Sequence, residues 1–253
     1  MTHRESTRPT RARGVAGNAL AQLAGDKRFL AVSTVVPVVV IYLLKVFWDA
    51  LDTPLAQQSR FAVPGGVFIV HFVTYVLTAI VLVRERVAGT MERMFISGYR
   101  PSEIVSGYLG AYTLLATVQS GIILVWLTFL FDLGLGASGT AEVFVVMWLM
   151  AVVSLAMGML VSNFARNEGQ VFPFIPLVML PPVFLSGMIV SIDALPTWAH
   201  AVSWVVPLRY AVDVIHEITD GVGILSEWGA LAMLPVMAVG FLSLASATLR
   251  EEV

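Results

Sequence analysis

The sequence predicts an all-α polytopic membrane protein, and three observations support this fold class. Of the 253 residues, 58% are hydrophobic and only 13% are charged, whereas a soluble domain carries roughly 25% charged residues. Apolar runs recur along the chain, and each is long enough to cross a bilayer as a helix. Basic residues gather in alternate connecting segments, which is the distribution that marks the cytoplasmic side of a membrane protein.

The predicted transmembrane helices are six apolar runs, at about 29–48, 62–83, 104–131, 143–161, 171–190 and 228–248. The third run is longer than a bilayer requires, so its ends should protrude or tilt. These runs contain no Asp or Glu, and their ionisable side chains are His71 and Lys45. We expect Lys45 to extend to the outer surface. His71 should pack between helices and hydrogen-bond a backbone carbonyl, with a proton-relay or substrate-contact role left open.

The charge distribution also predicts the orientation. Twelve of the 15 Lys and Arg residues precede the first run, separate the second from the third, or follow the fourth and sixth. Acidic residues occupy the other loops, so both termini should lie in the cytoplasm after an even number of crossings. The net charge of −2 gives no sign of a nucleic-acid partner, and the lack of Cys excludes disulfides and thiolate chemistry.

Residues 1–28 are predicted to form a basic arm and an interfacial helix ahead of a six-span domain at 29–253. The first 13 residues carry four arginines, and we expect a disordered arm that contacts anionic headgroups. The spacing of Leu20, Leu23 and Ala24 suits a helix that lies in the membrane interface. A plain extension of the first span is the alternative.

The loop at 84–103 carries four arginines between the second and third runs. Met91, Met94 and Phe95 fall at i, i+3 and i+4, so they would form one apolar face of a short helix. Thr90 can cap the start of that helix. An ordinary solvated loop is the alternative, but three large apolar residues at helical spacing favour an amphipathic helix at the membrane surface.

Four prolines interrupt the fifth run, namely Pro173, Pro176, Pro181 and Pro182. Proline removes a backbone donor, and carbonyls freed in lipid must find partners, so this span should face other helices or a water-accessible cavity. We therefore place these prolines, with His71, on a possible substrate path.

The segment at 191–220 is too polar to cross the membrane, yet it contains apolar residues at helical spacing. We predict one or two short helices here that re-enter the outer leaflet or lie on it. Trp198, Trp204 and Tyr210 would anchor these helices at the interface.

Two stretches resemble the membrane subunits of type-2 ATP-binding-cassette (ABC) exporters. Residues 84–94, RERVAGTMERM, are similar to the cytoplasmic E-R-E-x-G-T-x-E-x-L stretch of that family. Residues 184–210, which begin FLSGMIVSIDALPTW, look like the family signature between the fifth and sixth spans. The sequence departs from the family at Val87, Ser191 and Arg209, where an acid, a proline and a threonine are usual.

The resemblance implies a coupling helix that docks on a separate ATPase, and a gate at the outer face. The implied coupling residues are Glu85, Gly89, Thr90, Met91, Glu92, Arg93, Met94 and Phe95. The implied gate and re-entrant residues are Phe184, Ser186, Gly187, Pro196, Trp198, Pro207 and Tyr210. If the coupling role is right, replacing Glu92 with Lys or Phe95 with Ala should lower transport and leave membrane insertion intact.

The function that the resemblance implies is export of a hydrophobic drug or antibiotic across a prokaryotic cell membrane. Export of lipid or lipid-linked glycan is the next possibility. The chain would pair with a second permease chain, identical or homologous, and with two copies of a cytoplasmic ABC ATPase. It has no phosphate-cradling G-x-x-x-x-G-K-[ST] stretch. ATP and Mg²⁺ would therefore bind the partner, and this chain would hold no cofactor and no metal.

Two readings from other classes remain open at this point. An intramembrane enzyme acting on lipid would need a nucleophile, a base or metal ligands clustered at one depth. Of the four His residues only His71 lies in an apolar run, and the titratable groups concentrate at 200–217. The other reading is a passive channel or assembly factor, which would work without ATP.

Overall fold

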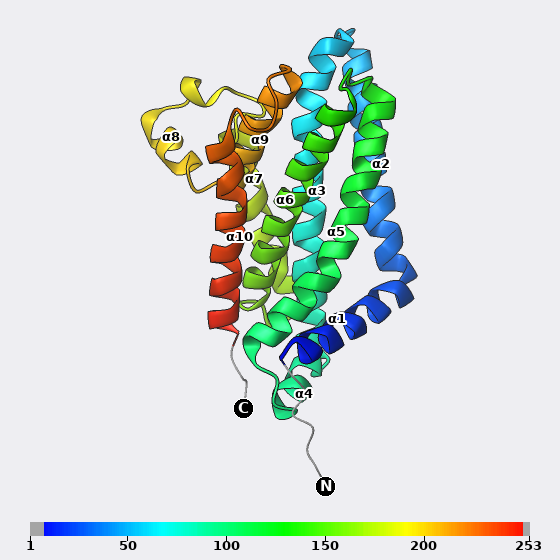
Figure 1. Cartoon of the computed structure of the whole chain (residues 1–253), viewed down its shortest axis with the longest axis vertical. Helices are drawn as coiled ribbons and strands as arrows, with labels where there is room; N and C mark the ends of the chain where they lie inside the picture. Colours follow the sequence, from blue (N-terminus) through cyan, green and yellow to red (C-terminus); the bar gives the residue numbers. More distant parts are fainter. Residues whose placement is uncertain (1–7, 250–253) are drawn as a thin grey trace.

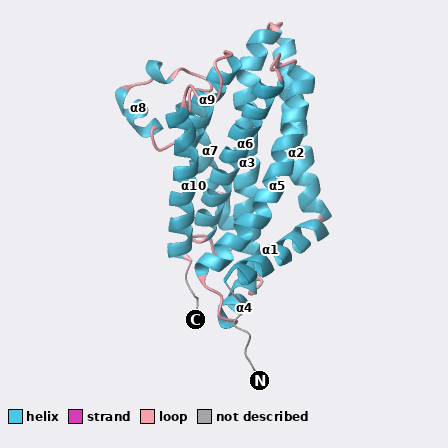
Figure 2. Cartoon of the chain, viewed as in Figure 1, coloured by secondary structure: helices cyan, strands magenta, loops and turns pink. Residues whose placement is uncertain are grey.

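The structure, a computed structural model, describes residues 8–249, and these form helices joined by short connections (Figure 1). The elements in chain order are α1 (Arg8–Gly25), α2 (Lys27–Ala50), α3 (Leu55–Val87), α4 (Thr90–Ile96), α5 (Pro101–Phe131), α6 (Ala137–Ser162), η1 (Glu168–Val171), α7 (Phe174–Leu185), η2 (Ile192–Ala194), α8 (Thr197–Ser203), α9 (Pro207–Thr219) and α10 (Trp228–Thr248). Figure 2 shows helices and loops but no strand within residues 8–249.

The prediction of six spans is confirmed. Six helical segments are long and apolar enough to cross a membrane, and they are Phe29–Ala50, Gln58–Val87, Pro101–Phe131, Ala137–Ser162, Glu168–Leu185 and Trp228–Thr248. The fifth combines η1 with α7, because the helix is interrupted where its first proline stands. All six predicted apolar runs therefore correspond to these segments.

The second span begins earlier than its apolar run at 62 predicts, because polar residues at its start are paired. Gln58 Nε2 donates to Thr53 O at 2.6 Å and to Asp49 Oδ1 at 3.2 Å. Lys45 Nζ donates to Gln58 Oε1 at 3.2 Å and forms an ion pair with Asp49. Lys45 is thus held by partners on α2 and α3. Its extension to the outer membrane surface stays a prediction.

The central helix of the bundle is α6, which packs against α3, α5, α9 and α10. Its contact with α3 is close because Gly158 has no side chain. A Cβ built at Gly158 would lie 2.9 Å from the carbonyl oxygen of Tyr75 and 2.9 Å from Thr78 Cβ. One turn away on α6, Ser154 Oγ lies 2.7 Å from His71 Nδ1 on α3. These small residues join two spans within the chain, as small residues commonly do in membranes.

The helix α1 lies across one end of the bundle and packs on α5 (Figure 1). Its buried side chains are Val15, Ala19 and Leu23, and Gly107 of α5 makes room for Val15. The prediction of a disordered arm is wrong for residues 8–13, which form the first turns of α1. Residues 1–7 of that predicted arm lie outside the described residues. The placement of α1 in a membrane interface stays a prediction.

The two ends of the bundle carry different elements. Helices α1 and α4 and the end of α10 lie at one end, which we call the α4 end (Figure 1). Helices α8 and α9 lie at the opposite end, the α9 end, where α8 projects to the side (Figure 1). The arrangement agrees with an even number of crossings. The assignment of the α4 end to the cytoplasm stays a prediction.

Candidate functional site

The short helix predicted between the second and third spans is present as α4. It begins after Gly89, whose φ of +70° is a conformation that favours glycine. The prediction that Thr90 caps the helix is wrong, because Gly89 is the capping residue and Thr90 is the first helical residue. Thr90 Oγ1 instead accepts a hydrogen bond from Arg93 Nη2 at 3.2 Å. Gly98, at φ +78°, follows the helix, and Pro101 begins α5.

The predicted apolar face of α4 exists, but it faces the bundle. Met91 is buried, and Met94 and Phe95 are partly buried against the core. Glu92 and Arg93 are exposed on the other side, and Ile96 is 88% exposed. A partner that reaches α4 would therefore meet Glu92, Arg93 and Ile96. Sequence reasoning missed Ile96, although its position outside the Met91, Met94, Phe95 stripe was visible.

Three residues near the end of α3, Arg84–Arg86, contact different parts of the bundle. Arg84 Nε lies 3.1 Å from Glu168 Oε1 of η1, and Arg84 Nη1 lies 3.5 Å from Asp26 Oδ2 between α1 and α2. The Tyr108 hydroxyl of α5 donates to Glu85 Oε2 at 3.4 Å. These contacts join the end of α3 to η1, to the junction between α1 and α2, and to α5.

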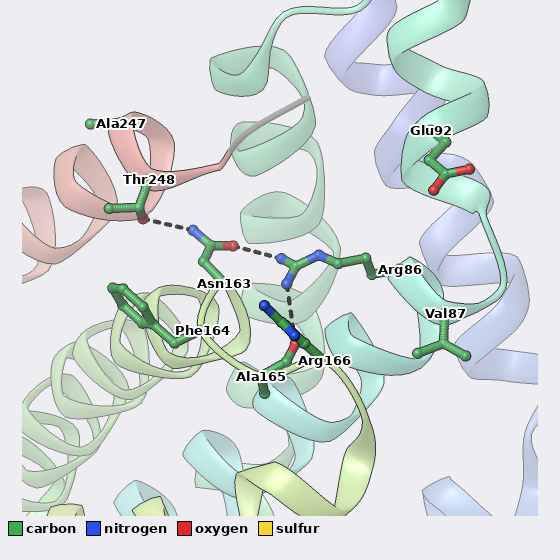
Figure 3. Close-up of a pocket in the computed structure, with 9 residues that line it drawn as sticks. All are labelled: Arg86, Val87, Glu92, Asn163, Phe164, Ala165, Arg166, Ala247 and Thr248. Atoms are coloured by element: carbon green, nitrogen blue, oxygen red, sulfur yellow. Dashed lines mark hydrogen bonds between the residues drawn. The ribbon is translucent and has the colours of Figure 1, made fainter. Parts of the chain in front are cut away.

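Arg86 joins the ends of α3, α6 and α10 (Figure 3). Its Nη1 donates to Ser162 O at 2.6 Å and to Ala165 O at 3.4 Å, and its Nη2 donates to Asn163 Oδ1 at 2.9 Å. Asn163 Nδ2 then donates to Ala245 O at 2.7 Å and to Thr248 Oγ1 at 2.9 Å. A guanidinium suits this place because the last carbonyls of a helix carry partial negative charge and need donors.

A cavity of about 800 Å³ opens beside this network at the α4 end (Figure 3). Its lining comes from α3, α4, the α6–η1 connection and α10, and comprises Arg86, Val87, Glu92, Asn163, Phe164, Ala165, Arg166, Ala247 and Thr248. Val87 and Phe164 are exposed apolar side chains, and Arg166 and Glu92 are exposed charged ones. This surface is therefore neither purely apolar nor purely charged, which is typical of a contact surface for a folded partner.

The predicted outer segment at 191–220 forms η2, α8 and α9. Ser186 is buried, Gly187 has a φ of +83°, and Pro196 immediately precedes α8. Pro207 begins α9, while Phe184 and Trp198 are exposed. The structure thus places Phe184 in the last turn of α7 and the other predicted gate residues along the segment that follows it, before the sixth span.

Tyr210 is not the surface anchor that we predicted. It is buried, and its hydroxyl donates to the carbonyl of Trp204 at 2.7 Å, which closes the turn between α8 and α9. Trp198 and Trp204 are exposed, as an interfacial position would require.

The fifth span is largely exposed within this chain. Pro173 immediately precedes α7, Pro176 lies in its first turn, and Pro181 and Pro182 lie inside it. We expected this span to face other helices or a water-accessible cavity. Within this chain it is the least buried of the six spans, so neighbouring helices of the same chain cover little of it. The prolines of a span indicate that it avoids lipid. They do not indicate whether the helix that covers it belongs to the same chain or to a partner.

His71 is fully buried in the packed interior of the bundle. Its Nδ1 meets the Ser154 hydroxyl at 2.7 Å, and that hydroxyl also reaches the Met150 carbonyl at 2.6 Å. The partner is a side chain, not the backbone carbonyl that we expected. The packed position itself agrees with the expectation, and the role of His71 on a substrate path stays untested.

At the α9 end, Asp213 of α9 is a partly buried carboxyl. Burial raises its pKa to about 6, the charge of Arg209 opposes this rise, and the charges of Glu227 and Asp193 add to it. Burial also lowers the pKa of the neighbouring His216, and the charge of Arg60 lowers it further. Asp213 and His216 belong to the concentration of titratable residues at 200–217 that the sequence showed.

Replacing Asp213 with Asn is expected to change how stability depends on pH. Because the pKa of Asp213 is higher in the folded protein than its ordinary value of 3.8, the folded state binds protons more tightly. The carboxyl therefore makes the free energy of unfolding fall as pH rises from about 4 to 6. Asp213→Asn should remove that decline, as measured by thermal unfolding in detergent between pH 4 and 7.

Asp220→Asn, at an exposed carboxyl that ends α9, controls for the loss of one negative charge. Parallel pH profiles for the parent protein and Asp213→Asn would contradict the prediction.

Comparison with known proteins agrees with this architecture. The ABC-2 type transporter family matches residues 15–219. The chain is 30% identical over 168 residues to the Escherichia coli K12 protein named probable multidrug ABC transporter permease YbhS, covering 65% of this chain and 44% of that protein. It is 26% identical over 165 residues to the linearmycin resistance permease protein LnrN of Bacillus subtilis, covering 64% of this chain and 42% of that protein.

A third relative is the inner membrane transport permease YhhJ of Escherichia coli K12, 28% identical over 197 residues, covering 75% of this chain and 52% of that protein. The chain spans about half the length of these relatives. The family match extends from α1 to the end of α9 and so includes both α4 and the α9-end segment. The chain is therefore a multi-pass membrane protein that belongs to the ABC-2 type transporter family.

Proposed function

We propose that this chain is the permease subunit of an ATP-driven exporter of hydrophobic small molecules, with drugs or antibiotics as the cargo. The observation that carries the proposal is α4, a short helix held at one end of the bundle with Glu92, Arg93 and Ile96 exposed. A separate ATPase, present in two copies in the prokaryotic cytoplasm, would bind this exposed face. The names of the multidrug and linearmycin resistance relatives support the cargo class.

In this proposal α4 passes force from the ATPase to the spans. Arg84, Glu85 and Arg86 lie just before α4 and contact η1, α5, α6 and the α1–α2 junction. A displacement of α4 would therefore reach several spans through hydrogen bonds and ion pairs. It would not depend on one flexible loop.

A second permease chain, identical or homologous, would pack on α7. The prolines of α7 leave carbonyls that lipid cannot satisfy. Its exposed side chains include Leu177, Leu180 and Phe184. A partner chain would cover this face, and the seam between the two chains would provide the path for substrate.

The test is to change the charge of the exposed face of α4, by adding one at Ile96 or reversing one at Glu92. Ile96→Asp and Glu92→Lys are each expected to lower substrate-stimulated ATP hydrolysis and transport about tenfold in vesicles that hold the chain and its ATPase, because central interface residues contribute up to several kcal/mol to binding. Both variants should insert normally, since neither side chain is buried.

Leu225→Asp is the matched control, because Leu225 is an equally apolar, 75% exposed residue between α9 and α10. Full coupling in both α4 variants, or an equal loss in Leu225→Asp, would contradict the proposal. Phe95→Ala is now expected to loosen the packing of α4 on the bundle, because Phe95 faces inward.

A further inference from the structure

We propose that a cavity at the α9 end binds the headgroup of a zwitterionic phospholipid, with arginines on its phosphate and aspartates on its ammonium group. The cavity has a volume of about 370 Å³. Its polar lining comes from α3, η2 and α9, and comprises Arg60, Ser191, Asp193, Arg209, Asp213 and His216. The proposal does not depend on the transport function proposed above.

The charges of the cavity match a group that carries both signs. Arg60 and Arg209 supply two positive charges, and Asp193 and Asp213 supply two negative ones. The guanidinium fork of arginine matches the oxygen atoms of a phosphate, while carboxylates accept the N–H groups of an ammonium ion. A purely anionic headgroup would meet two carboxylates, and a purely cationic one would meet two guanidinium groups. A zwitterion satisfies both sets.

The Arg209 side chain is held in place by neighbouring residues, and its Nε–H donates no hydrogen bond within the part of the chain that the structure describes. The residue is 8% exposed, its Nη1 donates to Ser203 Oγ at 2.6 Å, and its guanidinium lies 4.0 Å from the centroid of the Trp204 ring. Its Nε lies 3.8 Å from Asp213 Oδ2, which is too long for a hydrogen bond. This buried Nε–H has no hydrogen-bond partner among residues 8–249. A buried donor without a partner is costly. A shift of the Arg209 side chain that brings this N–H to the cavity surface would let a phosphate oxygen accept from it.

The walls of the cavity favour a lipid over a water-soluble phosphoester. Phe61, Met188 and Ile189 also line it. Ile189 and the next residue, Val190, are exposed apolar side chains, and they follow α7, whose own outer face is apolar. A headgroup in the cavity would thus leave its acyl chains beside an apolar strip, which they can contact without losing polar interactions.

The test uses the purified full chain in detergent and native mass spectrometry, with phosphatidylethanolamine and phosphatidylglycerol added at equal concentration. Phosphatidylethanolamine should be retained at least about tenfold more. Arg60→Ala and Asp193→Asn should each lower its retention about tenfold, and both residues are exposed, so folding should be preserved. Arg166→Ala, at an exposed arginine of the α4 end, is the control and should change nothing.

Equal or greater retention of phosphatidylglycerol would overturn the zwitterion assignment. Water-soluble phosphoethanolamine that displaces the lipid at equal concentration would overturn the lipid assignment. Loss of retention in Arg166→Ala equal to that in Arg60→Ala, or no retention of either lipid, would overturn the site itself.

Discussion

Gly158→Leu is expected to prevent accumulation of the folded protein. A Cβ at Gly158 would lie 2.9 Å from both the carbonyl oxygen of Tyr75 and Thr78 Cβ. A backbone carbonyl and a β-branched side chain cannot move aside, so α3 and α6 would have to separate. Overpacking of a core typically costs about 1–3 kcal/mol. The cost should exceed this range because separation would also break the contact between Ser154 and His71.

The measurement is the yield and apparent melting temperature of monodisperse protein extracted in mild detergent. Gly240→Leu is the matched control, because Gly240 lies in the α10 span and a Cβ there meets nothing within 4 Å. The control should accumulate and melt like the parent protein. A Gly158→Leu variant that melts within a few degrees of the parent would show that the two helices pack less closely than the structure describes.

Arg86→Ala is expected to uncouple the α4 end from the spans and to lower stability by about 2 kcal/mol. The substitution leaves the carbonyls of Ser162 and Ala165 without this donor, and it removes a partner of Asn163. Hydrogen bonds from a charged donor contribute about 1.5–3 kcal/mol. If an ATPase binds α4 as proposed, transport by the reconstituted complex should fall more than ATP hydrolysis does, because the ATPase would turn over without moving α6 and α10.

Arg84→Ala is the comparison within the same segment. Arg84 forms its ion pairs with Glu168 and Asp26 at a half-exposed position, and such surface pairs contribute about 0–1 kcal/mol. Its effect on stability should therefore be smaller than that of Arg86→Ala. A double-mutant cycle with Asn163→Ala measures the coupling directly, and strictly additive effects of Arg86→Ala and Asn163→Ala would contradict the network.

The spans and α4 were predictable because each depends on a local pattern. Twenty consecutive apolar residues need a bilayer, and Met91, Met94 and Phe95 at helical spacing need an apolar neighbour. The spacing of these three residues thus predicted an apolar face on α4. It could not predict which neighbour the stripe would contact, and the structure shows that the neighbour is the bundle itself.

The contacts of Arg86 and Arg209 could not be predicted, because they join residues far apart in sequence or depend on geometry. Arg86 and Asn163 lie 77 residues apart, and no local pattern links an arginine to a distant asparagine. The sequence singled out Arg209 only because a threonine is usual at that position in the family that the chain resembles. Its stacking on Trp204 and its unused Nε require the turn between α8 and α9, which composition does not encode.

The length of α3 determines how a movement at the α4 end is transmitted to the α9 end. Its 33 residues extend over about 50 Å, whereas the hydrocarbon layer is about 30 Å thick. Arg60 stands near one tip of this rod and Arg86 near the other. With Pro64 as its one internal proline, the helix would bend near the Arg60 end, so a small inclination of α3 would displace Arg86 far more than it displaces Arg60.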